Sequence, residues 1–258
     1  MIHGLDYMET SQSLYKHYLG KSDMVEQPYR AKETVKEDFD KITNYDEKRD
    51  MYYFERRLRR LLEEAPVDKE AVILDFGGGS GLFSLELKKR GYTNLHLLDL
   101  SPIQCQQAQE KGLENIHCGD ENFLAEKFPN ATFDFVFMCD VIEHVENPAG
   151  VLRKIRQVLK PQGRIFLTYP NPYWVPVLNV LGDIGLKLKG KDNKIYLRKL
   201  QKELKSEFTL QTHEGHMLVS KLPKPVLGFF EVVERGVPRF VKRKTCLLNV
   251  AVLHKIGE

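Results

Sequence analysis

The sequence predicts an α/β fold, a three-layer sandwich around a mostly parallel seven-stranded sheet that ends in an antiparallel hairpin. Two observations support this. Between residues 71 and 168, short runs of β-branched and aromatic residues alternate with helical patterns, which is typical of strand–helix units around a parallel sheet. Near the end of the chain, apolar runs at 229–233 and 246–254 flank the sequence GVPRFVKRK and predict the hairpin. A chain of 258 residues suits one decorated domain.

Residues that typically begin or end helices indicate where the elements before the hairpin lie. The segment LFSLELKKRG is a predicted helix, because basic residues occupy its last turn and Gly91 ends it. A second helix is expected to begin at Asn147 and Pro148, a cap followed by a first-turn proline, and to end before Pro161. The strands are expected at 71–75, 95–99, 116–118, 133–139 and 164–168.

Residues 1–66 are predicted to form a helical cap in front of the sheet. An amphipathic stretch in this region carries an apolar face of Met51, Phe54, Leu58, Leu61 and Leu62. Residues 67–258 are expected to form the main domain, with an insertion at about 170–225 on the substrate side.

Composition limits the class of protein. A net charge of +3 is too balanced to indicate a nucleic-acid partner by itself, although it does not exclude one. Four separated cysteines without a CxxC pair suggest neither a zinc knuckle nor a disulfide framework, so a cytoplasmic location is expected. The sequence shows no secretory signal and no membrane span. The interrupted apolar segment Tyr173–Leu188 is expected to act as a lid or a peripheral membrane contact.

The most informative motif is a buried strand that runs into a glycine-rich turn and then a helix. Gly77, Gly79 and Gly81 permit positive φ angles and close approach of the backbone to a flat ligand, which favours an adenosine cofactor. Asp99 ends the next strand, where its carboxylate can accept hydrogen bonds from ribose hydroxyls. Asp120 follows the third strand and can reach an adenine amino group. Each acid alone is also a common helix cap.

The glycine motif has the form D-x-G-x-G-x-G, and over roughly residues 70–170 the chain resembles the class I S-adenosylmethionine-dependent methyltransferases, which have a Rossmann-like fold. A nicotinamide-dependent dehydrogenase fits less well, because its loop usually reads G-x-G-x-x-G. The resemblance implies S-adenosylmethionine as cofactor, with glycines against its methionine part, Asp99 at the ribose and Asp120 with Glu121 at the adenine. The cofactor-binding residues that it implies are Asp75, Phe76, Gly77, Gly79, Gly81, Asp99, Leu100, Asp120, Glu121 and Cys139.

Candidate catalytic residues follow the fourth strand in the sequence CDVIEHVENP, which is similar to a motif of the ubiquinone-biosynthesis O-methyltransferases. Three interpretations of this segment remain open. His144 is a candidate general base for a hydroxyl acceptor, together with Glu143. Asp140, Glu143 and His144 are instead a possible site for a divalent metal. Alternatively, Glu143 and His144 only orient the following helix. His216 is a second catalytic candidate, because related methyltransferases often carry a histidine in this region.

Two further groups of residues have a functional and a structural interpretation. Tyr169, Tyr173 and Trp174 form either an aromatic wall for the substrate or part of the core. The basic residues at 56–60 and 187–194 either contact phosphate or form solvated helix faces.

The sequence therefore predicts an S-adenosylmethionine-dependent methyltransferase that acts on a small-molecule, lipid-like or glycan-like acceptor at oxygen. The alternatives are an RNA or protein methyltransferase and a non-catalytic module that binds the cofactor.

Overall fold

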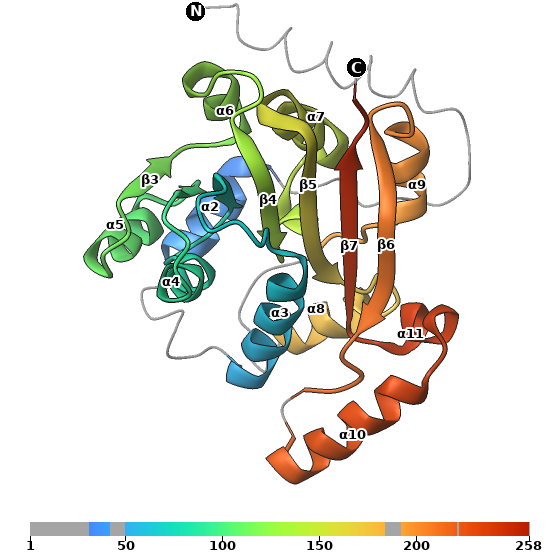
Figure 1. Ribbon diagram of the computed structural model, residues 1–258. Helices are drawn as coiled ribbons and strands as arrows, with labels where there is room; N and C mark the ends of the chain where they lie inside the picture. Colours follow the sequence, from blue (N-terminus) through green and yellow to red (C-terminus); the bar gives the residue numbers. More distant parts are fainter. Residues whose placement is uncertain (1–30, 42–49, 184–191, 221, 258) are drawn as a thin grey trace, which may run out of the picture.

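The computed structural model describes residues 31–41, 50–183, 192–220 and 222–257. Seven strands form one sheet in the order β3-β2-β1-β4-β5-β7-β6 (Figure 1). The first five strands in this order are parallel, and β7 is antiparallel to both of its neighbours. The predicted fold class is confirmed. The strands are β1 Ile73–Phe76, β2 Leu95–Asp99, β3 Asn115–Cys118, β4 Phe133–Cys139, β5 Leu159–Pro170, β6 Phe208–His216 and β7 Leu248–Lys255.

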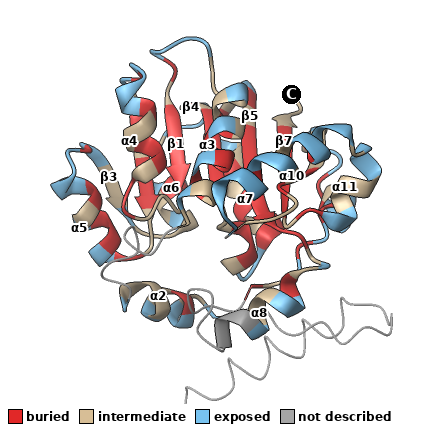
Figure 2. Ribbon diagram, turned by 90° about the horizontal axis from the view of Figure 1, so that it is seen from below, coloured by how far each residue is buried: buried red, intermediate tan, exposed pale blue. Residues whose placement is uncertain are grey.

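Helices cover both faces of this sheet, and the strands between them are largely buried (Figure 2). One face packs against α6, α7 and α9, and the other packs against α3 and α4. No described helix is long and apolar enough to cross a membrane. The helices are α2 Lys32–Asp40, α3 Met51–Glu64, α4 Leu82–Lys89, α5 Pro102–Glu110, α6 Glu121–Lys127, the short 3-10 helix η1 Ile142–His144, α7 Pro148–Val158, α8 Val175–Asp183, α9 Leu197–Glu203, α10 Lys224–Gly236 and α11 Arg239–Thr245.

The helices expected before Gly91 and after Asn147 are present as α4 and α7. The Asn147 side chain accepts a hydrogen bond from the Gly150 backbone N–H (2.9 Å), as a cap should. In the N-terminal region, α3 buries Phe54, Leu58 and Leu61 against the sheet, whereas Met51 is exposed. Residues 1–30 and 42–49 of the predicted cap lie outside the described residues.

The prediction of a strand at 229–233 is wrong, because these residues lie within helix α10. Helix α10 begins directly after Pro223, contains Pro225 in its first turn and continues for 13 residues, a length that suits a helix rather than a strand. Besides β5, the antiparallel neighbour of β7 is β6, which takes the place of the predicted strand and lies inside the segment predicted as an insertion. As an edge strand, β6 exposes polar side chains and gives only a weak apolar pattern.

Candidate active site

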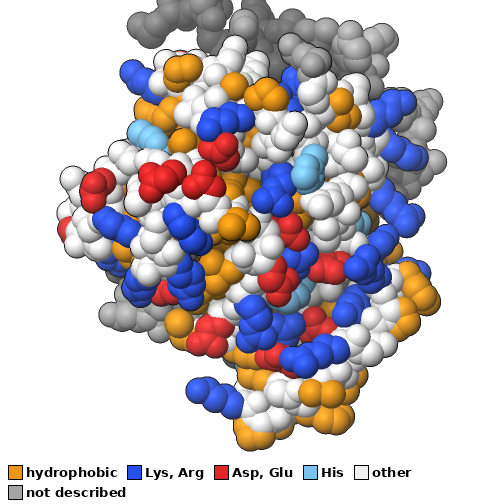
Figure 3. Space-filling model, in the orientation of Figure 1, with side chains coloured by type: hydrophobic (Ala, Val, Ile, Leu, Met, Phe, Trp, Pro, Cys, Tyr) orange, Lys and Arg blue, Asp and Glu red, His pale blue; other side chains and the backbone are white. Residues whose placement is uncertain are grey.

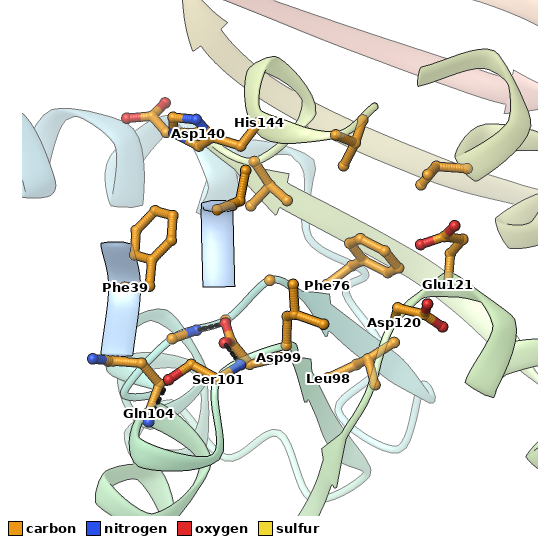
Figure 4. Close-up of a pocket in the computed structure, with 18 of the residues that line it drawn as sticks. Phe39, Phe76, Leu98, Asp99, Ser101, Gln104, Asp120, Glu121, Asp140 and His144 are labelled. Atoms are coloured by element: carbon orange, nitrogen blue, oxygen red, sulfur yellow. Dashed lines mark hydrogen bonds between the residues drawn. The ribbon is translucent and has the colours of Figure 1, made fainter. Parts of the chain in front are cut away.

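A cavity of about 440 Å³ opens at the carboxyl ends of β1, β2, β3 and β4. This volume lies within the usual range of small-molecule sites. Parallel strands commonly deliver ligand-binding residues to this edge of a sheet. Asp120 and Glu121 lie at one end of the cavity, Asp140 and His144 at the other, and Asp99 between them (Figure 4).

The glycine loop forms part of the cavity wall. Gly77 and Gly79 line the cavity with φ angles of 72° and 55°. A Cβ atom on Gly77 would approach the Val141 side chain to 2.6 Å, whereas one on Gly79 would meet no atom closer than 3.7 Å. Gly81 caps α4 outside the cavity, and a Cβ there would approach Leu113 to 2.3 Å. The loop therefore requires glycine for both backbone conformation and close packing.

Two aspartates fix the loop to the strands. Asp75 is buried, lines the cavity and accepts a hydrogen bond from the Ser84 hydroxyl (2.7 Å), which ties β1 to α4. Asp99 accepts hydrogen bonds from the backbone N–H groups of Gly79 (2.7 Å) and Ser101 (2.9 Å). Burial raises the pKa of Asp99 above its usual range, although these two backbone donors oppose the shift. Its carboxylate is thus held in one orientation at the middle of the cavity.

The acids after β3 bind a lysine from the N-terminal region. Lys32 Nζ in α2 lies 2.7 Å from both Asp120 Oδ2 and Glu121 Oε1. Asp120 also caps α6 by accepting a hydrogen bond from the Asn122 backbone N–H (2.8 Å). Burial alone would raise the pKa of Asp120, but the hydrogen bonds from Lys32 and Asn122 outweigh it, so the pKa is lowered. Asp120 is therefore a helix cap and a cavity residue at once.

The charges around the cavity suit a cationic ligand. The basic residues that line it are Lys32, Lys36 and Arg57, and the acidic ones are Asp75, Asp99, Asp120, Glu121, Asp140 and Glu146. S-adenosylmethionine carries a sulfonium and an ammonium group, so this excess of carboxylates fits that cofactor. Every cofactor-binding residue predicted from the sequence lines the cavity except Gly81. Burial raises the pKa of the Cys139 thiol among them, which keeps it neutral.

At the other end of the cavity, Asp140 binds three side chains. Its carboxylate accepts hydrogen bonds from Arg57 Nη1 (2.7 Å), Tyr53 Oη (3.0 Å) and Thr168 Oγ1 (2.8 Å). Asp140 has a φ angle of 60°, an uncommon conformation for a residue other than glycine. Burial, followed by the charge of Asp140, raises the pKa of Tyr53 well above its usual range. Tyr53 is therefore a neutral hydrogen-bond donor.

His144 faces the cavity beside Phe39, and their ring centroids are 5.6 Å apart in an edge-to-face arrangement (Figure 4). Its Nε2 atom lies 3.9 Å from Oδ1 of the buried Asp192. Asp192 is itself positioned by Asn179, whose Oδ1 accepts from the Asp192 backbone N–H (2.9 Å). Sequence analysis missed Asp192, because an acid within the lysine-rich sequence KGKDNK gives no signal that it is buried.

The other catalytic candidates lie elsewhere. Glu143 is buried and does not line the cavity. His216 lines a separate cavity of about 340 Å³ with Arg56 and Glu234, so the structure does not bring it to His144. Burial, followed by the charge of Arg56, lowers the pKa of His216 to about 4.

A metal site at Asp140, Glu143 and His144 is not supported. In the described part of the chain, no group of three or more His, Cys, Asp or Glu side chains could hold a metal ion. The physical reason is that the Asp140 carboxylate turns to Arg57 and Tyr53, while Glu143 is buried outside the cavity.

The basic run at 56–60 is not a solvated face throughout. Arg56 and Arg57 are buried, and they pair with Glu234 and Asp140, because α3 packs against acidic partners. None of the aromatic residues Tyr169, Tyr173 and Trp174 lines the cavity; Tyr169 is buried at the end of β5, and Trp174 donates a hydrogen bond to the Thr245 carbonyl oxygen (3.0 Å). Residues 184–191, which include the end of the predicted lid and Lys187, Lys189 and Lys191, lie outside the described residues.

Comparison with known proteins agrees with this geometry. Residues 45–218 match the family model described as a methyltransferase domain. The human EEF1A lysine methyltransferase 2 is 27% identical over 178 residues, which cover 67% of this chain and 65% of that protein. The ubiquinone biosynthesis O-methyltransferase of Xylella fastidiosa strain 9a5c is 35% identical over 107 residues, which cover 39% of this chain and 42% of that protein. The matches therefore span less than two thirds of these relatives.

A solved structure of an S-adenosylmethionine dependent methyltransferase from Mesorhizobium loti shares the fold, with a TM-score of 0.56 at 17% identity, over 76% of this chain and 96% of that chain. The matched family region includes all four strands whose ends border the cavity, together with α3. The chain therefore belongs to the methyltransferase-domain family of class I S-adenosylmethionine-dependent methyltransferases.

Proposed function

We propose that this chain transfers a methyl group from S-adenosylmethionine to an oxygen atom of a small-molecule, lipid-like or glycan-like acceptor. The observation that carries this proposal is the placement of His144 at one end of the cavity, with the buried Asp192 behind it. A base at this position suits a hydroxyl acceptor, because a hydroxyl must lose its proton during methyl transfer.

The residues that would hold the cofactor are those of the glycine loop, Asp99, and the acids Asp120 and Glu121. When bound, the cofactor supplies a methyl carbon activated by a positively charged sulfur atom. The fixed carboxylate of Asp99 would accept hydrogen bonds from the ribose hydroxyls, in addition to those from Gly79 and Ser101. The rigid loop would hold the methyl group in line with the acceptor, and this positioning is the main contribution a protein makes to a displacement.

His144 would accept the hydroxyl proton as the acceptor oxygen is methylated. Asp192 would stabilise the resulting imidazolium and orient the ring, since its carboxylate is buried and its backbone is held by Asn179. Asp140 and Arg57 would form a polar wall beside His144 that contacts polar groups of the acceptor, and the hydrogen bond from Tyr53 would hold Asp140 in place.

For the domain organisation, we propose a cap of residues 1–66 on a methyltransferase domain of residues 67–258, with the segment at about 170–225 on the substrate side. The described cap helices support this, because α2 and α3 contribute Lys32, Phe39 and Arg57 to the cavity wall.

A protein lysine side chain is the second candidate acceptor, and the similarity to the human lysine methyltransferase favours it. The test uses purified chain, S-adenosylmethionine with an isotope-labelled methyl group, and a cell extract separated into small-molecule, lipid and protein fractions. We expect labelled methyl ethers or esters in the first two fractions, and their loss with His144→Ala. Label confined to lysine residues of the protein fraction would contradict the proposal.

A further inference from the structure

Helices α10 and α11 connect β6 to β7 in place of a hairpin turn; α10 extends away from the sheet, and α11 lies against the end of β6 (Figure 1). Their outer side is apolar. Along the helix, apolar residues recur every three or four positions, and the exposed ones are Leu222 (41%), Val226 (40%), Phe229 (63%), Val232 (65%) and Val233 (38%), together with Phe240 (70%) of α11. We call these six residues the apolar face. Figure 3 shows hydrophobic side chains gathered with basic ones at this end of the molecule.

The acids of this segment are held in ion pairs with α3, and cations outnumber acids in it. The two acids of α10 turn toward α3: Glu234 is buried and accepts two hydrogen bonds from Arg56 Nη2 (both 2.9 Å), and Glu231 accepts one from Arg59 (3.3 Å). The basic residues from 224 to 244 are Lys224, Arg235, Arg239, Lys242, Arg243 and Lys244, and all but Lys242 and Arg243 are exposed. In α11, Arg239 precedes the exposed Phe240 and Lys244 lies one helical turn after it, and we call these two cations the basic rim.

The ion pairs with α3 therefore hold α10 with its apolar face outward, and the exposed cations Arg239 and Lys244 lie beside Phe240 in α11. A soluble protein rarely exposes so many large apolar side chains together unless the patch binds something. Two copies of the chain would bring two sets of cations together, which disfavours self-association through this face. A partner surface that is both apolar and anionic would complement the apolar face and the cations beside it.

We propose that the apolar face and its basic rim form a binding surface for anionic lipid bilayers. Helix α10 would lie in the plane of the interface, with Phe229 and Val232 among the acyl chains and Arg239 and Lys244 at the lipid head groups. This surface is separate from the cavity beside His144, so the inference does not depend on the identity of the methyl acceptor.

The test is co-sedimentation of the full chain with vesicles of phosphatidylcholine and with vesicles of an equimolar mixture of phosphatidylcholine and phosphatidylglycerol. We expect binding to the anionic vesicles that weakens with added salt. Val232→Glu and Arg239→Glu should each weaken it by roughly tenfold. The matched controls are Val67→Glu and Lys205→Glu, which change exposed residues elsewhere and should leave binding unchanged.

Circular dichroism and thermal unfolding of each variant confirm that it is folded. The proposal is overturned if the wild-type chain does not sediment with anionic vesicles, or if the two face variants bind them as well as the controls do. It is equally overturned if analytical ultracentrifugation shows a dimer that Val232→Glu dissociates, because a second copy of the chain would then cover the face.

Discussion

At the scale of single residues, Asp99 shows how one carboxylate can hold a glycine-rich loop in a fixed conformation. Its two oxygens accept from the backbone N–H groups of Gly79 and Ser101, so the side chain links the glycine loop to the start of α5. A carboxylate held in this way loses little freedom when a ligand binds, which favours affinity.

We expect Asp99→Ala to weaken the binding of S-adenosylmethionine by roughly tenfold to a hundredfold, the usual effect of losing hydrogen bonds to a charged group. Isothermal titration calorimetry measures the change. Glu126→Gln, at an exposed position in α6, is the control and should bind as the wild type does. An unchanged affinity in a folded Asp99→Ala variant would remove Asp99 from the cofactor site.

His144 and Asp192 allow a second test at this scale. We expect His144→Ala to lower kcat by roughly a hundredfold or more, and Asp192→Asn to lower it by less, because only the first removes the base itself. Both variants should keep the wild-type affinity for S-adenosylmethionine, and Asp192→Glu should recover part of the lost kcat. If Asp192→Asn instead changes cofactor affinity and thermal stability but not kcat, Asp192 is only structural.

His216 gives a prediction for the dependence of stability on pH. Its pKa is lowered to about 4 in the folded chain, whereas an unfolded histidine titrates near 6.5. Between these values the unfolded state binds more protons, so the free energy of unfolding falls as the pH falls from about 6.5 to 4.

Replacing the histidine removes this contribution, which is about 3 kcal/mol at most. The loss of stability from pH 6.5 to 4 should therefore be smaller in His216→Gln than in the wild type. Urea unfolding at a series of pH values measures it, and parallel curves for the two proteins would show that His216 is protonated equally in both states.

At the scale of elements, β6 and α11 are in very close contact. A Cβ atom on Gly215 would lie 2.0 Å from the Lys242 carbonyl oxygen, so only glycine fits between the strand and the helix. The antiparallel pair and the helical connection therefore depend on each other for their position.

We expect Gly215→Ala to destabilise the chain by roughly 2 to 3 kcal/mol, since backbone must move to relieve the contact. Gly228→Ala is the matched control: a Cβ there meets no atom within 4 Å, and alanine in a helix should stabilise by roughly 0.5 to 1 kcal/mol. Urea unfolding compares both variants. Equal stabilities would mean that α11 moves away from β6 without cost.

Strand β6 and helix α10 show where prediction from the sequence reached its limit. The parallel strands β1, β2, β4 and β5 were predictable because they are largely buried, so each contains a short apolar run, whereas the edge strand β3 is only partly buried. Strand β6 lies at the sheet edge with polar residues outward, while α10 is rich in the β-branched and aromatic residues that are common in strands. The sequence pattern therefore predicted a strand within α10 and missed the strand β6.

At the scale of the whole molecule, the candidate site divides into two kinds of residue. The cofactor side follows the strand ends in chain order, from Asp75 to Asp99 to Asp120, and a motif with its context predicts it. The rest of the site is assembled from distant segments: Lys32, Phe39 and Arg57 of the wall come from the cap, and Asp192, which lies behind His144, follows α8. Such residues meet only through tertiary packing, which a single sequence does not reveal.

The buried pair of Arg56 and Glu234 joins residues that lie 178 positions apart in the sequence. During synthesis the ribosome delivers α3 long before α10, so Arg56 cannot bind Glu234 until α10 has emerged. A buried charge without its partner is strongly unfavourable. Arg56 can therefore stay in contact with water until α10 emerges, and the contact between α3 and α10 forms after the strands that lie between them in the sequence.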